Sequence, residues 1–199
     1  MIRVAVFGAL GRMGREVTKA VLADGDLELA GAVDIAVEPG GSVAVKGASD
    51  ILIGANAGCL VPEDIDVMVD FTRADSALSN IRWALSNGIH SVVGTTGISE
   101  ADMEEISREA AGEGPNVVVA SNFALGAVLM MKFAEAAATV FKQCEIIELH
   151  HPGKIDAPSG TALSTAKRIE SATGSGGLPA GSESLPGVRG GVFGPVRIH

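Results

Sequence analysis

Residues 2–14 read Ile2-Arg-Val-Ala-Val-Phe-Gly8-Ala-Leu-Gly11-Arg-Met-Gly14, and this stretch decides the expected fold of the chain. An apolar segment, Ile2–Phe7, runs into a glycine turn, and a helical pattern follows. A strand, a glycine turn and a helix in this order are typical of the first unit of a dinucleotide-binding domain. The N–H groups at the start of such a helix bind a pyrophosphate. The stretch therefore predicts cofactor contacts from Gly8, Ala9, Leu10, Gly11, Arg12 and Met13.

The glycine spacing departs from the usual G-x-G-x-x-G pattern, because Leu10 stands where the second glycine is normally found. Taken alone, such a turn is weak evidence, since it is also found in purely structural roles. Asp34 strengthens the interpretation, because it follows Gly14 by 20 residues, at the end of a second apolar segment. A carboxylate there accepts hydrogen bonds from the hydroxyls of the adenosine ribose.

Asp34 also bears on the choice of cofactor. A carboxylate near the ribose 2′ position repels a 2′-phosphate, and the neighbouring Ile35 brings no positive charge to offset that repulsion. Arg12 offsets it only in part. We therefore predict that NADH is the preferred cofactor and that NADPH is tolerated at best.

Apolar segments and helical patterns alternate through residue 123, which is typical of a parallel sheet covered on both faces. The expected strands are Ile2–Phe7, Leu27–Val33, 67–71, 91–93 and 117–120, and the expected helices are 13–23, 75–87 and 100–112. The pattern weakens between residues 38 and 62, where we expect loops with one short strand near 51–53. The fold class is therefore α/β, with a Rossmann-type doubly wound parallel sheet over residues 1–123.

The pattern changes from residue 124. A long helix is expected over 127–142, then a strand over 145–149 and a second helix from about Thr161. Residues 172–195 are rich in Gly, Ser and Pro, which is typical of a mobile loop or lid. A new strand should begin at Val196, yet lone strands are not stable. We expect a smaller α+β domain over 124–199 that is shortened at its C-terminus, or else a naturally small domain completed by oligomerisation.

Composition limits the function classes. The 199 residues carry 24 acidic and 15 basic side chains, so a nucleic-acid surface is not expected. The two cysteines, Cys59 and Cys144, lack a C-x-x-C spacing, which argues against a disulfide framework and favours a reducing compartment. No basic leader and no segment of spanning length is found. We therefore expect a cytoplasmic protein without a membrane partner.

A second stretch, Glu145-Ile-Ile-Glu-Leu-His-His-Pro-Gly-Lys-Ile-Asp-Ala-Pro-Ser-Gly-Thr-Ala162, carries most of the candidate chemistry. It leads from a strand through a turn into a helix. Neighbouring strand residues point to opposite faces, so His150 and His151 fit separate roles, proton handling and anion binding, better than a shared metal. Lys154 adds positive charge, although a solvated turn residue is the simpler alternative. No metal is expected.

The start of the following helix is a candidate anion site. Ser159 is a good N-cap, and the N–H groups of Gly160 and Thr161 can bind a carboxylate. Glu148 and Asp156 are placed to orient the cationic groups by hydrogen bonding, unless they are simply exposed.

Two further strand ends fit a ligand crevice, because open α/β sheets bind ligands beyond the carboxyl ends of their strands. Ordinary turn chemistry would explain either of them in isolation. They add Gly94, Thr95, Thr96, Ala120, Ser121, Asn122 and Phe123 to the candidate cofactor contacts.

The stretch 145–162 resembles the signature of the 4-hydroxy-tetrahydrodipicolinate reductase (dihydrodipicolinate reductase) family. The glycine turn, Asp70-Phe-Thr72, Gly94-Thr-Thr-Gly97 and Ser121-Asn-Phe123 match that family in the same order, so the resemblance covers essentially the whole chain. Ala74 departs from it, since the family often has proline there. The resemblance implies the reduction of a small cyclic imine-type dicarboxylate with NADH or NADPH, in lysine and diaminopimelate biosynthesis.

The resemblance also implies individual roles. His150 would be the catalytic acid/base and Lys154 a second proton donor. The substrate carboxylate would be bound by His151, Gly160 and Thr161, supported by Ser159. A homotetramer built on the second domain is implied as well, and the expected shortening bears on both activity and tetramer formation. The alternatives are a non-catalytic dinucleotide-binding module and another NAD-dependent dehydrogenase acting on an amino-acid-type substrate.

Overall fold

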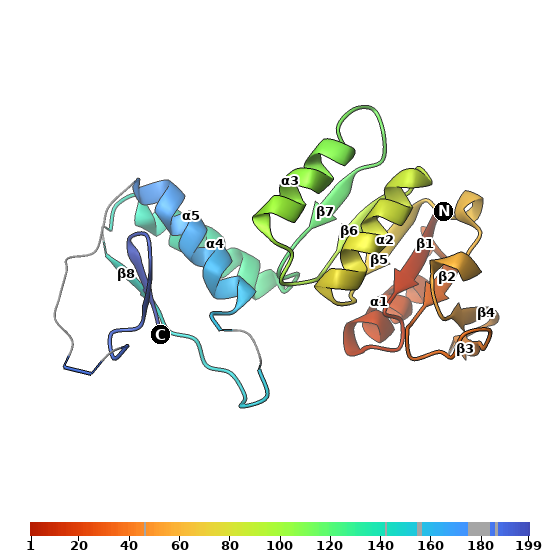
Figure 1. Ribbon diagram of the computed structural model, residues 1–199, viewed down its shortest axis with the longest axis horizontal. Helices are drawn as coiled ribbons and strands as arrows, with labels where there is room; N and C mark the ends of the chain where they lie inside the picture. The colour runs from red at the N-terminus through yellow and green to blue at the C-terminus, as the bar shows by residue number, and fades with distance from the viewer. Residues whose placement is uncertain (46, 142, 155–156, 175–183, 186) are drawn as a thin grey trace. The chain divides into compact units, whose positions relative to one another are not determined.

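The computed structural model describes residues 1–45, 47–141, 143–154, 157–174, 184–185 and 187–199. The chain divides into two compact units, Met1–Ala120 (unit 1) and Ser121–His199 (unit 2), each with its own sheet (Figure 1). This division follows residue 120, whereas the sequence predicts a domain boundary after residue 123. The predicted Rossmann-type α/β fold, followed by a smaller α+β unit, is confirmed.

Unit 1 is built on one mixed sheet with the strand order β3-β4-β2-β1-β5-β6-β7 among its described residues. The strands β1, β2, β4, β5, β6 and β7 pair in parallel, and only β3 is antiparallel to its neighbour. The strand bounds are β1 (Ile2–Phe7), β2 (Leu27–Val33), β3 (Val43–Val45), β4 (Ala48–Gly54), β5 (Val67–Asp70), β6 (His90–Val93) and β7 (Val117–Val119). The helices are α1 (Arg12–Ala23), α2 (Ala74–Ser86) and α3 (Glu100–Glu109).

Alternate side chains of β1 face two different cores, because successive strand residues point to opposite faces. Val6 belongs to the core that contains Val21 of α1, whereas Phe7 belongs to the core that contains Ile81 of α2 and Ile106 of α3. In Figure 1, α2 and α3 lie side by side in front of the sheet. The chain therefore reverses its winding direction between β1 and β5, which leaves a crevice at the carboxyl ends of these strands.

The segment between β2 and β5 differs from the prediction. The strand expected near 51–53 is present within the longer β4, and the structure adds β3, which pairs with β4 in a hairpin, and two 3-10 helices, η1 (Ala57–Cys59) and η2 (Pro62–Asp64). Val45 and Ile53 are buried in the same core as α1. The hairpin escaped prediction because its few apolar residues are separated by glycines and polar residues, so the local pattern is weak.

α3 shows the predicted start and an earlier end. Ser99 caps it by accepting a hydrogen bond from the Asp102 N–H at 3.1 Å, and Asp102 accepts one from the Ser99 N–H in return. This capping box satisfies two otherwise unpaired donors. The helix ends at Glu109, whereas the pattern predicts residue 112.

Thr18 offers a test of packing in unit 1. Thr18 lies on the buried side of α1, and its hydroxyl has no hydrogen-bond partner among the described residues. Such a group costs about 1–3 kcal/mol, and valine has the same shape. We expect Thr18→Val to raise the free energy of unfolding by about 1 kcal/mol in urea denaturation. The matched control is Thr165→Val, which should lower it, because the equally buried Thr165 hydroxyl donates to the Thr161 carbonyl at 2.7 Å.

Arg3 ties the start of β1 to the turn before β5. Its backbone N–H donates to Asp66 Oδ2 at 2.8 Å, and its guanidinium donates to Asp66 Oδ1 at 2.8 Å. These side-chain and backbone hydrogen bonds from Arg3 lower the pKa of Asp66 from 3.8 to about 2.

A lowered pKa in the folded state means that the Arg3–Asp66 pair stabilises the fold above the ordinary pKa and loses that effect as the pH falls through about 2. We expect Asp66→Asn to lower the free energy of unfolding at neutral pH. The difference from the wild type should shrink steadily as the pH falls from about 4 towards 2. Urea titrations across this range measure it, and a difference that persists unchanged at the acidic end would contradict the assignment.

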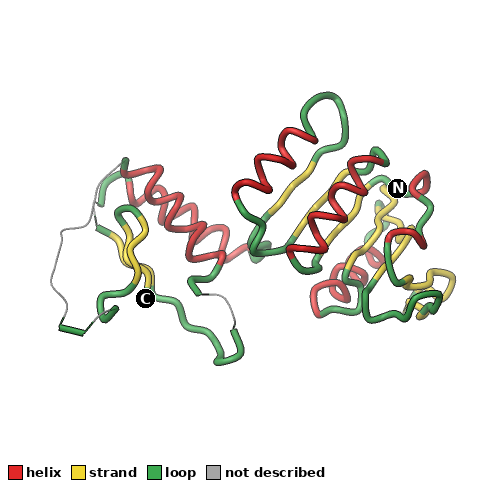
Figure 2. The backbone as a smooth tube through the Cα atoms, viewed as in Figure 1, coloured by secondary structure: helices red, strands yellow, loops and turns green. Residues whose placement is uncertain are grey.

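Unit 2 packs two helices on a sheet of three described strands. The elements are α4 (Leu125–Ala138), β8 (Cys144–Ile146), α5 (Gly160–Thr173), β9 (Gly191–Phe193) and β10 (Val196–Ile198). β10 lies between its neighbours, parallel to β8 and antiparallel to β9. Figure 2 draws the strands in yellow and the helices in red. Ala138 of α4, Ile169 of α5 and Val196 of β10 share its core.

Three predictions for unit 2 need correction. The strand expected over 145–149 ends at Ile146, because β10 pairs with residues 144–146 only. The Gly-rich stretch expected to be a mobile loop contains β9, which gives β10 a hairpin partner, so the sheet is not a lone strand. The expected helix over 127–142 ends at Ala138. Residues 175–183 and 186, on which much of the lid prediction falls, lie outside the described residues, as does Lys142.

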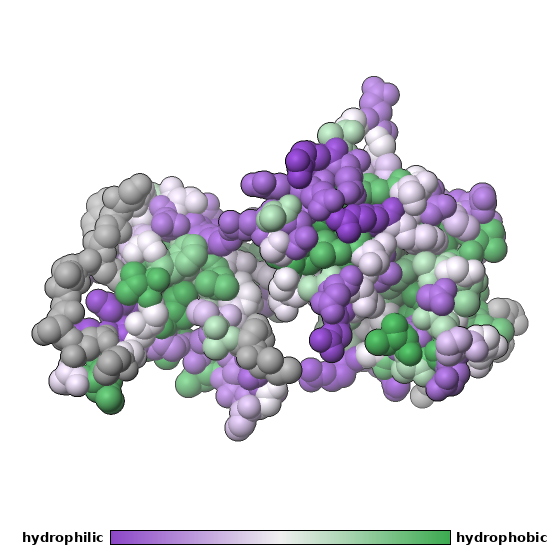
Figure 3. Space-filling view, viewed as in Figure 1, coloured by the Kyte–Doolittle hydropathy of each residue, from purple (hydrophilic) through white to green (hydrophobic). Residues whose placement is uncertain are grey.

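The surfaces of the two units differ in polarity. In unit 1, hydrophilic side chains gather over α3 (Figure 3). In unit 2, large apolar side chains are exposed on α4, for example Leu125 and Phe133, and beyond β8, for example Ile147 and Leu149.

None of the helices in the described part of the chain combines the length and the hydropathy needed to cross a membrane.

Candidate active site

The glycine turn joins β1 closely to α1. Gly8 adopts a φ of +78°, which glycine tolerates, and its N–H donates to the Val33 carbonyl at 2.9 Å. A Cβ at Gly14 would overlap the Gly8 carbonyl oxygen and lie 2.7 Å from the carbonyl carbon. The first turn of α1 therefore rests directly on the turn. No side chain caps the helix at Gly11, so its first N–H groups are available to an anion.

Asp34 supports this turn as well as lying at the end of β2. Its Oδ2 accepts a hydrogen bond from the Leu10 N–H at 2.8 Å, and its Oδ1 accepts one from the Ala36 N–H at 2.9 Å. Leu10, in the place of the usual second glycine, thus links the turn to the acidic residue. Each carboxylate oxygen keeps a further lone pair for a ligand hydroxyl.

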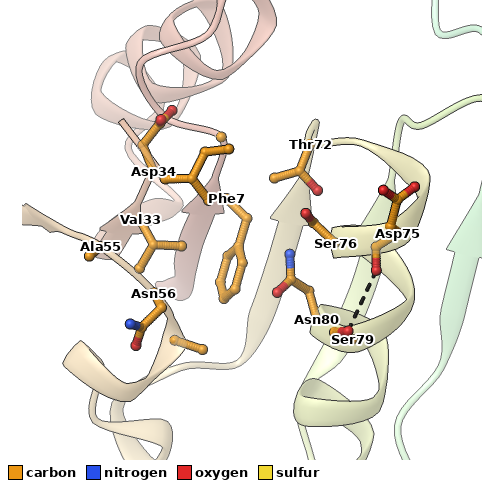
Figure 4. Close-up of a pocket in the computed structure, with 13 residues that line it drawn as sticks. Phe7, Val33, Asp34, Ala55, Asn56, Thr72, Asp75, Ser76, Ser79 and Asn80 are labelled. Atoms are coloured by element: carbon orange, nitrogen blue, oxygen red, sulfur yellow. Dashed lines mark hydrogen bonds between the residues drawn. The ribbon is translucent and has the colours of Figure 1, made fainter. Parts of the chain in front are cut away.

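A cavity of about 320 Å³ lies at the carboxyl ends of β1, β2 and β4. Figure 4 shows Asp34 and Asn56 on one side of it, Thr72 and Asn80 on the other, and Phe7 between them. The lining residues are Phe7, Gly8, Val33, Asp34, Ile35, Ala55, Asn56, Ala57, Thr72, Asp75, Ser76, Ser79 and Asn80.

The cavity contains some predicted cofactor residues and omits others. Gly8 and Asp34 line it, whereas Ala9 and Leu10 line a second cavity of about 360 Å³ beside α1 and the β3–β4 hairpin. The wall formed by α2 was not predicted. Thr72 was within reach of prediction, because it belongs to the Asp70-Phe-Thr72 motif. For Ser76 and Asn80 no local signal exists, because a helix sequence does not tell which strand end its polar residues face.

The loops that follow β5 and β6 are connected by a hydrogen bond. Asp70 is fully buried, and its Oδ1 accepts hydrogen bonds from the Thr72 N–H and from Thr72 Oγ1, both at 2.7 Å. Asp70 Oδ2 accepts one from Asn80 Nδ2 at 2.7 Å. Thr95 is buried, and its hydroxyl donates to the Thr72 carbonyl at 3.0 Å. Thr95 therefore supports the loop after β5 from behind. A Cβ at Gly94 would overlap the ring of Phe71.

In unit 2, the Glu148 carboxylate connects the segment after β8 with the start of α5. Its Oε1 accepts a hydrogen bond from the Ser159 N–H at 2.8 Å, and its Oε2 lies 3.7 Å from His150 Nδ1. The Glu148 side chain is only 17% exposed. Burial opposes its charge, but the hydrogen bonds from Ser159 and the positive charges of His150 and Lys154 outweigh burial, so the pKa of Glu148 is lowered. The sequence left open whether Glu148 orients other groups or is merely exposed; in the structure it is largely buried and hydrogen-bonded to the Ser159 N–H, while its Oε2 has no hydrogen-bond partner among the described residues.

The start of α5 also receives the segment predicted to contact the cofactor. Ser159 is the predicted N-cap, and its Oγ accepts a hydrogen bond from the Ala162 N–H at 3.0 Å. Asn122 Nδ2 donates to Thr161 Oγ1 at 3.0 Å. Ser121 and Ser164 share a hydrogen bond of 3.1 Å between their hydroxyls. Predicted cofactor and substrate residues thus meet at one helix end.

The two neighbouring histidines do not lie on a strand. β8 ends before them, and both His150 and His151 are exposed in the following loop, so the opposite-faces argument does not apply. The Lys154 N–H donates to the His151 carbonyl at 3.1 Å and closes a turn there. Asp156 lies outside the described residues. In the described residues, no group of three or more His, Cys, Asp or Glu is placed to hold a metal ion.

The arrangement in unit 2 suits an anionic ligand that receives a proton. The N–H groups of Gly160 and Thr161, in the first turn of α5, attract a carboxylate. His150 and Lys154 both lie in the loop that follows Glu148. The Glu148 carboxylate is hydrogen-bonded to Ser159 at the start of the same helix. In unit 1, the uncapped start of α1 at the glycine turn suits a pyrophosphate, and the cavity at the strand ends lies where open α/β sheets bind nucleotides.

Comparison with known proteins matches both halves of the chain to one enzyme. Residues 2–123 match the family described as dihydrodipicolinate reductase, N-terminus, and residues 126–193 match dihydrodipicolinate reductase, C-terminus. A 4-hydroxy-tetrahydrodipicolinate reductase from Thermobifida fusca is 47% identical over 204 residues, covering 100% of this chain and 75% of that protein. The protein of the same name from Moorella thermoacetica is 43% identical, covering 100% and 76%.

A solved structure is similar as well. It is a dihydrodipicolinate reductase from Paenisporosarcina sp. TG-14 with dipicolinate bound, and it has a TM-score of 0.76 and 35% sequence identity. The match covers 100% of this chain and 77% of that one.

Proposed function

The chain belongs to the dihydrodipicolinate reductase family, and from this we propose that it reduces 4-hydroxy-tetrahydrodipicolinate to tetrahydrodipicolinate with NADH or NADPH, in lysine and diaminopimelate biosynthesis. The observation that carries the proposal is the Glu148 carboxylate, which contacts both the His150 ring and the helix start at Ser159. One group thereby orients a proton donor beside an anion site, as the reduction of a dicarboxylate requires.

We assign roles within unit 2 from these contacts. His150 is the general acid; its Nδ1 faces Glu148, which leaves Nε2 for the substrate. Lys154 is a second proton donor. The substrate carboxylate is bound by His151, Gly160 and Thr161, while Ser159 holds the turn by capping α5.

The cofactor site draws on both strand ends and the glycine turn. A bound reduced nicotinamide supplies the hydride for the reaction. Residues 1–123 form the dinucleotide-binding domain and residues 124–199 the substrate-binding and oligomerisation domain in this proposal. The assigned cofactor contacts are Gly8, Ala9, Leu10, Gly11, Arg12, Met13, Asp34, Gly94, Thr95, Thr96, Ala120, Ser121, Asn122 and Phe123.

We expect NADH to be preferred over NADPH. Asp34 faces the cavity with a negative charge, and no Lys or Arg is among the described residues that line it. Replacing Ile35, which is 81% exposed at the cavity rim, with arginine should lower the KM for NADPH about tenfold or more, while changing the KM for NADH less. Initial rates at varied cofactor concentration measure this. A wild-type enzyme that saturates at far lower NADPH than NADH would contradict the role of Asp34.

We also propose a cytoplasmic homotetramer assembled through unit 2, without nucleic-acid or membrane partners. The exposed apolar side chains of unit 2 support this, because such surfaces mark contact sites between subunits. Light scattering after size-exclusion chromatography would give the oligomeric state directly, and a monomer at all concentrations would contradict the assembly.

One assay separates the proposed enzyme from its alternative, a non-catalytic dinucleotide-binding module. NADH absorbance is followed with freshly generated 4-hydroxy-tetrahydrodipicolinate, and NADH binding is measured separately by the fluorescence of the bound cofactor. Substrate-dependent oxidation supports the reductase. Binding without oxidation supports the binding module.

A further inference from the structure

Asp70 is a buried carboxylate at the end of β5 that does not line the cavity itself. It is fully buried, and neutral donors satisfy it: the Thr72 N–H, the Thr72 hydroxyl and the Asn80 amide, each at 2.7 Å. Both Thr72 and Asn80 line the cavity. The direction of their hydrogen bonds to Asp70 therefore determines which hydrogen-bonding groups remain for a ligand.

Thr72 has a single hydroxyl hydrogen. The charged Asp70 Oδ1 accepts it at 2.7 Å, whereas the other acceptor within reach, the Arg73 carbonyl, lies at 3.4 Å. Hydrogen bonds to a charged acceptor are the stronger ones. With its hydrogen committed, Thr72 can only accept from a ligand.

Asp70 also fixes the orientation of the Asn80 amide, so that an acceptor atom is left for a ligand. Its Nδ2 donates to Asp70, and Figure 4 shows its amide oxygen on the cavity side. The carboxylates of Asp34 and Asp75 also line the cavity. These four side chains consequently offer acceptors, which suit ribose hydroxyls and an adenine amino group and repel a phosphate, whereas Asn56 and Ser76 elsewhere in the lining can donate.

We propose that Asp70 is a positioning residue that selects the dinucleotide without a 2′-phosphate, by turning Thr72 and Asn80 into hydrogen-bond acceptors. The inference rests on the proposed function, which places the cofactor in this cavity. It differs from the direct repulsion by Asp34, because Asp70 acts through two other side chains.

Asp70→Asn tests the proposal with an isosteric change. The neutral amide oxygen accepts the Thr72 hydrogen more weakly than the charged carboxylate does, and the NH2 that replaces Oδ2 can no longer accept from Asn80 Nδ2. Both side chains are thereby released from their role as acceptors. We expect the Kd for NADH to rise about tenfold and the Kd for NADPH to rise less than about threefold, so that the preference for NADH falls. Fluorescence titration of both cofactors measures this without turnover. A parallel rise for both cofactors overturns the proposal and assigns Asp70 a structural role only.

A double-mutant cycle with Thr72→Val tests the route through the hydroxyl. Thr72→Val removes the same acceptor and leaves the buried charge in place, so it should itself reduce the preference for NADH. Adding Asp70→Asn to Thr72→Val should then change the preference less than it does in the wild-type background, because only the route through Asn80 remains. An undiminished change in this background overturns the proposal, and the single Thr72 variant keeps the test valid where Asp70→Asn does not fold.

Two controls complete the design. Asp66→Asn removes another aspartate of unit 1 that is absent from the cavity lining, and it should leave the preference unchanged. If the wild type binds neither cofactor, the proposed function fails together with this inference. If the wild type prefers NADH and the Asp70 variant keeps that preference, only this inference fails.

Discussion

Replacing His150 with glutamine should lower kcat by a factor on the order of 10²–10⁴, because a positioned general acid contributes that much and an amide does not transfer the proton. The Kd for NADH should change little, since the histidine lies in the loop after β8 and the glycine turn belongs to unit 1. Steady-state rates at saturating substrate, with cofactor binding measured in parallel, test both parts.

His151→Gln is the matched comparison for that experiment. The neighbouring imidazole is assigned to carboxylate binding, so this variant should mainly raise the KM for the substrate, by about tenfold. If His150→Gln leaves turnover intact, the proton donor is another group and the role of Glu148 as its partner is lost with it. If both variants behave alike, the two histidines do not have separate roles.

Gly14→Ala is expected to have the other large effect. The new Cβ would overlap the Gly8 carbonyl oxygen, and neither backbone segment can move without opening the junction of β1 and α1. Overpacking of this kind costs about 1–3 kcal/mol or more, which exceeds the gain of about 1 kcal/mol in helix propensity. We expect a lower free energy of unfolding in urea and a Kd for NADH raised at least about tenfold, because the anion-binding turn is displaced.

Gly126→Ala is the control for this substitution. Gly126 lies in the first turn of α4, and a Cβ there meets nothing within 4 Å. The same chemical change should therefore be neutral or stabilising by up to about 1 kcal/mol, with NADH binding unchanged. Equal effects of the two substitutions would show that close packing at Gly14 does not control the turn.

Local patterns were sufficient for most elements of unit 1. The strands Ile2–Phe7 and Leu27–Val33 have the predicted bounds, because each is a mainly apolar segment that is followed by Gly8 or by Asp34. The start of α3 follows from Ser99 and Asp102, which interact within one turn. The strand predicted near 51–53 is part of β4, but its hairpin partner β3 does not follow from the sequence, because its stability depends on burial in the core with α1 and not on a regular local pattern.

The candidate site likewise contains parts that local sequence patterns predict and parts that depend on tertiary packing. The glycine turn, Asp34 and the helix start at Ser159 carry their signals in neighbouring residues, so sequence patterns predict them. The wall of the cavity formed by α2 depends on how that helix is placed against β5 and β6, which is a matter of tertiary packing.

Asp70 and Glu148 show most clearly which properties of a residue the sequence predicts and which depend on the tertiary structure. Sequence alone places Asp70 near the end of one predicted strand and Glu148 within another, and it supplies the motifs around them. It does not say whether either carboxylate is solvated or enclosed. Folding brings Asn80 to Asp70 and Ser159 to Glu148, across 10 and 11 residues of chain. These partners decide the outcome, because a carboxylate remains charged in a buried position only where hydrogen-bond donors replace the water that it has lost.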